Sequence, residues 1–210
     1  MIKNKKFKIL TICMIAICLL TVFSGCQSAG HHSKNEVSKW AEEVTGQQIV
    51  VNNEYVDEKN EDGYTNRIWT AYYKSCPEIT FKIIDTEYEY MEVSEWCLTS
   101  LHDYAVGEYY FNKFNETNNI SDLFPEITSY YQTQFSLRGD VKTLDDIYGL
   151  VEEMKSIEEY FAQQEIDFHR SYVLYIEQEQ LNLKTEIRVN NKDINMLEYR
   201  AIAVFKSDDN

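Results

Sequence analysis

The four histidines are where acid–base or metal chemistry would be sought first in this 210-residue chain, because imidazole titrates near neutral pH and binds metal ions. His31 and His32 lie in a polar, aperiodic segment, where no rigid neighbour is expected to orient them as ligands. His102 precedes Asp103 in a predicted helix, and adjacent helical side chains point about 100° apart, so no dyad is expected. His169 is predicted to lie exposed on a strand. We therefore expect surface or packing roles for all four.

No catalytic or cofactor motif accompanies these histidines. The sequence contains no zinc-protease, paired-cysteine, nucleophile-elbow, P-loop or dinucleotide-binding motif. We therefore expect no enzymatic activity, no catalytic residue, no metal site and no cofactor.

Acidic residues and tyrosines alternate in one extended stretch, at Asp85, Glu87, Tyr88, Glu89 and Tyr90. The three carboxylates share one face of an extended chain, and a divalent cation prefers several such oxygen ligands. The same pattern is typical of an acidic strand edge that prevents aggregation, and we favour that interpretation. Tyrosine offers large contact area with a polar tip, so these five residues are the candidate binding face. Rings and carboxylates face opposite ways, so only one set would meet a partner directly.

Tyrosine is abundant beyond that strand, with sixteen in the chain. In the adjacent pair Tyr72-Tyr73, a strand would send one ring into the core and leave the other outside. Tyrosines of this kind either carry a binding surface or fill half-buried positions in a small sheet.

The N-terminal segment has the composition of an export signal. Four lysines precede an apolar run, residues 9–23, which is shorter than the roughly 20 residues that a membrane-spanning helix needs. Small residues then lead to a cysteine, in the order Phe23-Ser24-Gly25-Cys26. This arrangement resembles the lipobox of bacterial lipoproteins. The resemblance implies that Cys26 receives a lipid and that the chain is cleaved after Gly25.

The alternative for this segment is an uncleaved signal anchor with an unmodified cysteine. Either way the lysines stay inside, so we expect a membrane-attached protein whose bulk faces outside. The predicted organisation is a signal peptide, 1–25, a lipidated cysteine and flexible tether, 26–35, and one domain, 36–210.

Charge limits the partners of this domain. The chain has a net charge of −15, and loss of the four N-terminal lysines makes it −19. Such a surface repels nucleic acid, which we exclude as a partner, and favours a basic protein. We expect a lipid-anchored, extracytoplasmic protein-binding module, and immunity-type protection against a secreted toxin is one specific form. The alternative is a lipoprotein that binds a solute or a peptidoglycan fragment for a transporter or sensor.

Two cysteines, Cys76 and Cys97, remain in the predicted domain. Outside the membrane two such thiols pair readily, so they are a candidate disulfide. The alternative is a pair of reduced, buried cysteines that pack as small apolar side chains.

The spacing of apolar residues predicts one α+β domain, with an antiparallel sheet of about five strands and three to four helices. Residues 122–142 fit either a helix or an edge strand. Thr143 and Asp146 have the spacing of a capping box. Strands are predicted at 47–56, 64–75, 79–86, 167–177 and 181–189, and helices at 36–45, 98–114, 143–164 and from 194 onward.

Overall fold

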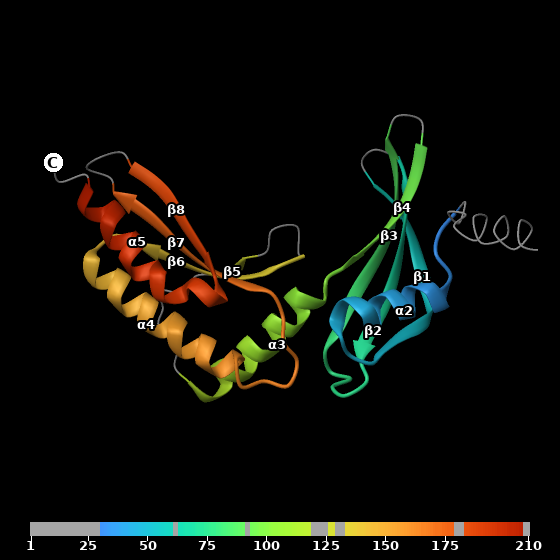
Figure 1. Cartoon of the computed structure of the whole chain (residues 1–210), viewed down its shortest axis with the longest axis horizontal. Coiled ribbons are helices and arrows are strands. Elements are labelled where there is room, and N and C mark those ends of the chain that lie inside the picture. The colour runs from blue at the N-terminus through green and yellow to red at the C-terminus, as the bar shows by residue number, and fades with distance from the viewer. Residues whose placement is uncertain are drawn as a thin grey trace, which may run out of the picture.

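The computed structural model describes residues 30–60, 63–90, 93–118, 126–128, 133–178 and 183–207. The fold is α+β, as predicted. Within the described residues, four α-helices accompany eight strands, which form two sheets of four (Figure 1).

The first sheet is an antiparallel meander in chain order, preceded by a helix. Helix α2 begins with a capping box between Ser33 and Glu36, and it ends at Gly46, whose φ of 65° favours glycine. Turns then separate strands rich in β-branched and aromatic residues. The elements are α2 (Lys34–Thr45), β1 (Ile49–Lys59), β2 (Thr65–Tyr73), β3 (Thr80–Tyr90) and β4 (Val93–Ser100).

The two faces of the first sheet differ in what covers them. The buried face includes Trp69, Ala71 and Tyr73 of β2 and packs against helices α2 and α3 (His102–Thr117). Tyr72 is only half-buried on the other face, so the predicted split of the Tyr72-Tyr73 pair is confirmed. We call that other face the outer face. One of its rows runs in register across all four strands: Val56, Ile68, Ile84 and Thr99.

The second sheet has the order β5-β6-β7-β8, and a parallel pair lies at its centre. Helix α4 crosses from β6 to its parallel neighbour β7, and α4 and α5 pack together over the sheet. The elements are β5 (Glu126–Thr128), β6 (Phe135–Val141), α4 (Leu144–Phe161), β7 (Arg170–Gln178), β8 (Leu183–Asn190), the 3-10 turn η2 (Asn191–Asp193) and α5 (Ile194–Ser207).

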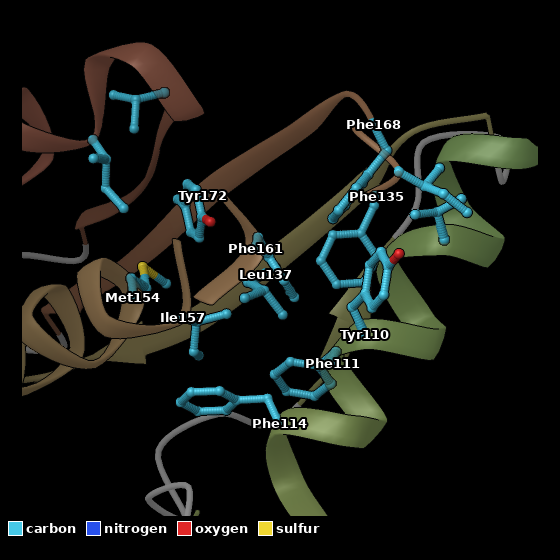
Figure 2. Close-up of a cluster of buried hydrophobic side chains, with 14 of the residues drawn as sticks. Tyr110, Phe111, Phe114, Phe135, Leu137, Met154, Ile157, Phe161, Phe168 and Tyr172 are labelled. Atoms are coloured by element: carbon cyan, nitrogen blue, oxygen red, sulfur yellow. The ribbon is translucent and has the colours of Figure 1, made fainter. Parts of the chain in front are cut away.

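Phe135 of β6 lies at the centre of an aromatic core that joins helix α3 to the second sheet (Figure 2). Its ring contacts Phe111, Phe161 and Phe168 at centroid distances of 6.4, 5.8 and 5.7 Å. A Cβ on Gly107 would lie 2.2 Å from this ring, so only glycine lets α3 approach so closely. Helix α3 thereby links the two sheets.

The single five-stranded sheet of the sequence-based prediction is replaced by two sheets. Residues 98–100, predicted to begin a helix, instead end strand β4, which pairs along β3. In the second sheet the parallel pair was not predicted either. Part of the ambiguous stretch 122–142 forms strands β5 and β6.

Candidate functional site

The predicted binding face on β3 is not an exposed edge. β3 lies inside the first sheet, between β2 and β4, and Asp85 is fully buried. Glu87 is half-buried. The backbones of Tyr88, Glu89 and Tyr90 belong to β3, but their side chains lie outside the described residues. The interpretation of this stretch as an edge strand is therefore wrong.

Asp85 instead binds the two N-terminal histidines. Its carboxylate accepts a hydrogen bond from the His32 amide at 2.6 Å, and its Oδ1 lies 2.9 Å from His32 Nδ1. His31 Nδ1 lies 3.4 Å from Asp85 Oδ2, and the His31 ring packs edge-on against Trp96 at 4.2 Å. Residues 31 and 32 are thus part of the folded domain, which corrects the prediction that nothing orients them.

A second ion pair lies beside this cluster on the same face. Arg67 donates to both oxygens of Asp57, at 2.9 and 3.1 Å, and its guanidinium stacks over Tyr55 at 3.8 Å. Hydrogen bonding to Arg67 lowers the pKa of Asp57. Register places Asp57, Arg67 and Asp85 side by side on three neighbouring strands, so each carboxylate has a basic neighbour.

The other two histidines flank Asp103, which is 6% exposed at the start of α3. His102 Nε2 lies 3.3 Å from Asp103 Oδ1, and His169 Nδ1 lies 3.3 Å from Oδ2. The His169 amide also donates to Asp103 at 2.7 Å. Burial lowers the pKa of His102, although Asp103 opposes the shift. The prediction that His102 and Asp103 stay apart is wrong, because in the first helical turn the two side chains fold toward each other.

Each described histidine therefore contacts one of two buried aspartates, which are supplied by different elements. His169 was predicted to be exposed, and 90% of its side chain is. Sequence analysis missed Asp103 as the centre of a cluster, because His169 approaches it from 66 positions away.

The Asp103 cluster borders a cavity of about 290 Å³ between helix α2 and the second sheet. A neighbouring cavity of about 390 Å³ shares His169 and Asn191 with it. The first cavity also contains Lys192, for which no ion pair occurs among the described residues. Its lining is Val44, Thr45, His102, Asp103, Asp167, Phe168, His169, Asn191 and Lys192.

Ser100, His102 and Asp103 resemble a nucleophile relay in contact distances alone. Ser100 Oγ lies 3.0 Å from His102 Nδ1, but it also accepts the His102 amide at the helix start. Ser100 is not among the residues that line these two cavities. Within the described ranges, no group of three or more histidine, cysteine or acidic side chains is arranged to hold a metal ion.

Cys76 and Cys97 are both free thiols. Cys97 lies opposite Thr86 in the β3–β4 register, whereas Cys76 precedes the start of β3 at Thr80. Thr80 and Thr86 are six residues apart along β3, which corresponds to roughly 20 Å. A disulfide requires the two Cα atoms to lie within about 7 Å of each other. The predicted bridge therefore does not form in this fold. Burial also raises the pKa of the Cys76 thiol, which disfavours a thiolate nucleophile.

A buried ion pair ties α4 to β7. The Arg170 side chain is 3% exposed and donates to both Glu158 oxygens at 2.7 Å, and Tyr172 donates to the same carboxylate at 2.6 Å. Burial raises the pKa of Tyr172, and the adjacent Glu158 raises it further. Arg170 also donates a hydrogen bond to the Phe168 carbonyl. We therefore assign this network a structural role.

Comparison with known proteins gives no match to any family, curated protein or solved structure. Among the described residues, no helix combines the length and apolarity needed to cross a bilayer. The predicted signal peptide and Cys26 lie outside the described residues.

Proposed function

We propose that this protein is a lipid-anchored, extracytoplasmic binding module without enzymatic activity, which holds a basic protein on the outer face of its first sheet. The observation that carries the proposal is that no described helix covers this face. The helices that contact the first sheet, α2 and α3, pack on its buried face, and no described helix packs on the outer one.

The composition of the outer face suits a protein interface. Val56 is 58% exposed, and the side chains of Ile68 and Ile84 beside it are half-buried. Two acidic residues, Glu58 and Glu95, are exposed on the same face toward the ends of β1 and β4. An apolar centre with a charged rim is the usual anatomy of such interfaces.

The negative charge of the chain indicates that its partner is positively charged. At −19 the predicted mature chain attracts a cationic surface and speeds the encounter, whereas apolar burial holds the complex once formed. Immunity-type protection against a secreted basic toxin is one specific form of this function. It would place the binding face outside the membrane, where such a toxin arrives.

The runner-up function, binding of a small polar solute, rests on the cavity beside Asp103, which Lys192 also lines. Ligand sites usually enclose about 300–1,000 Å³ and are mostly apolar. At about 290 Å³ and with a polar lining, this cavity is at the lower limit. The neighbouring cavity of about 390 Å³ lies within that range, so solute binding stays the second candidate function.

Site-specific photo-crosslinking tests the proposal. A photoreactive residue at Val56 should crosslink one basic protein, whereas the same residue at Tyr199, which is 70% exposed on α5, should not. The crosslink should weaken in about 0.5 M salt, where screening acts within about 5 Å. Equal crosslinking at both positions, or a partner that is acidic, would contradict the proposal.

A further inference from the structure

We propose that a patch at the end of the first sheet that holds Asp57, Arg67 and Asp85 rests on the bilayer surface to which Cys26 is attached. The patch lies on the side of the sheet opposite the outer face. This membrane-side patch consists of His31, His32, Tyr55, Asp57, Arg67 and Trp96. The inference deepens the proposed function and rests on the lipid anchor that it includes.

The length of chain between anchor and fold carries the first step. Four residues lie between Cys26 and His31, and the five residue steps from one to the other span at most about 17 Å when fully extended. His31 and His32 are held on the fully buried Asp85, so the folded body begins there rather than at helix α2. A compact domain of this size has a radius of gyration of about 16 Å. So short a connection must bring the surface around His31 to the lipid headgroups.

The chemistry of that surface suits a headgroup region. Tyr55 is 45% exposed and Trp96 is partly exposed, and tyrosine and tryptophan are the side chains that favour membrane interfaces. Lysine 34 begins α2 next to the histidines and adds a positive charge. The His31 ring contacts Trp96, and the Arg67 guanidinium stacks over the Tyr55 ring.

An acidic chain is repelled by anionic lipid, and ion pairing within the patch reduces this repulsion. Asp57 pairs with Arg67 through two hydrogen bonds, and Asp85 is fully buried and accepts a hydrogen bond from the His32 amide. Glu87 lies half-buried opposite Trp96 in the register and carries a negative charge at the rim of the patch. The pairing of Asp57 with Arg67 therefore reduces the repulsion between this part of the patch and anionic lipid.

The strand geometry then sets the orientation. Neighbouring residues of β1 face opposite sides, so Tyr55 points to the membrane-side patch and Val56 to the outer face. With the patch on the lipid, the outer face points away from it. The partner-binding face of the proposed function is thereby presented to the surroundings of the cell.

Fluorescence quenching in vesicles tests this orientation. The full chain is produced with Cys76→Ser and Cys97→Ser and purified from membranes as the processed protein, whose Cys26 thiol is blocked if it carries lipid. An environment-sensitive fluorophore is attached at Tyr55→Cys or, as the matched control, at Val56→Cys. The variants are incorporated into vesicles of phosphatidylcholine and phosphatidylglycerol with brominated acyl chains.

Several-fold stronger quenching at position 55 than at position 56 is the expected result. Equal quenching at both positions, or stronger quenching at 56, would overturn the inference while mass analysis and vesicle flotation still showed the lipid on Cys26. A protein that lacks the lipid and does not float would overturn the anchor itself, and the inference with it. The two failures are therefore distinguishable.

Discussion

Replacement of Arg170 by methionine should destabilise the protein strongly, because it leaves a carboxylate buried without its partner. The Glu158 side chain is 15% exposed and receives two 2.7 Å bonds from Arg170, so it cannot recover its hydration when the guanidinium is removed. The Phe168 carbonyl loses its 2.9 Å donor as well. Breaking a buried pair of this kind costs about 3–5 kcal/mol in the free energy of unfolding.

Urea denaturation measures this loss. With a slope of about 2 kcal/mol per molar urea, Arg170→Met should lower the unfolding midpoint by roughly 1.5–2.5 M at unchanged slope. The matched control is Arg138→Met, because Arg138 pairs with Asp140 at 3.1 Å on an exposed surface. An exposed pair contributes less than about 1 kcal/mol.

A variant that lacks the whole network shows whether the loss of stability comes from the carboxylate left without a partner. The triple change Arg170→Met, Glu158→Leu and Tyr172→Phe leaves no charge and no hydroxyl to satisfy, so it should be more stable than Arg170→Met alone. A loss below about 1 kcal/mol for the single variant would refute the reasoning. So would a triple variant that is no more stable than the single one.

Three further predictions concern other parts of the molecule. Gly107→Ala should lower the free energy of unfolding by about 1–3 kcal/mol, because the added Cβ would overlap the aromatic core. Gly149→Ala, at a position within α4 where the added Cβ meets no other atom, should raise it by up to about 1 kcal/mol. Thermal unfolding of the two variants measures both effects. The pKa of His102 is lowered from 6.5 in the folded protein, so the unfolded chain binds the proton first as pH falls, and the free energy of unfolding should decrease below about pH 6.5. Urea titrations of His102→Gln between about pH 5 and 7.5 should show a weaker dependence of this free energy on pH. An unchanged dependence would count against this assignment. Alkylation and intact-mass analysis should find Cys76 and Cys97 both free, and one bridge per molecule would contradict the sheet register.

Local patterns predicted helices better than they predicted sheets. The capping box and apolar stripe placed helix α4 within three residues of its observed ends, Leu144–Phe161, and Gly46 marked the end of α2. These features depend on residues close together in the chain. Strand β4 was missed because no turn-forming residues separate it from β3 in the sequence, and pairing along β3 holds its residues extended.

The histidine clusters could not have been predicted from local pattern. Asp85 and His32 are 53 positions apart, and Asp103 and His169 are 66 apart. Only the packing of the sheets brings them together. The acidic alternation at 85–89 was correctly assigned to an extended strand, but whether that strand lies inside a sheet or at its edge depends on the missed β4.

The order of elements along the chain bears on the order in which the two sheets would fold. Helix α2 and strands β1 to β4 occupy one continuous stretch, and each strand pairs with the next, so every pairing closes only a short loop. The parallel pairing of β6 with β7 must wait for the whole of α4 between them. Contacts between near residues form faster than distant ones. A chain that emerges N-terminus first would therefore complete its first sheet while its second half is still emerging.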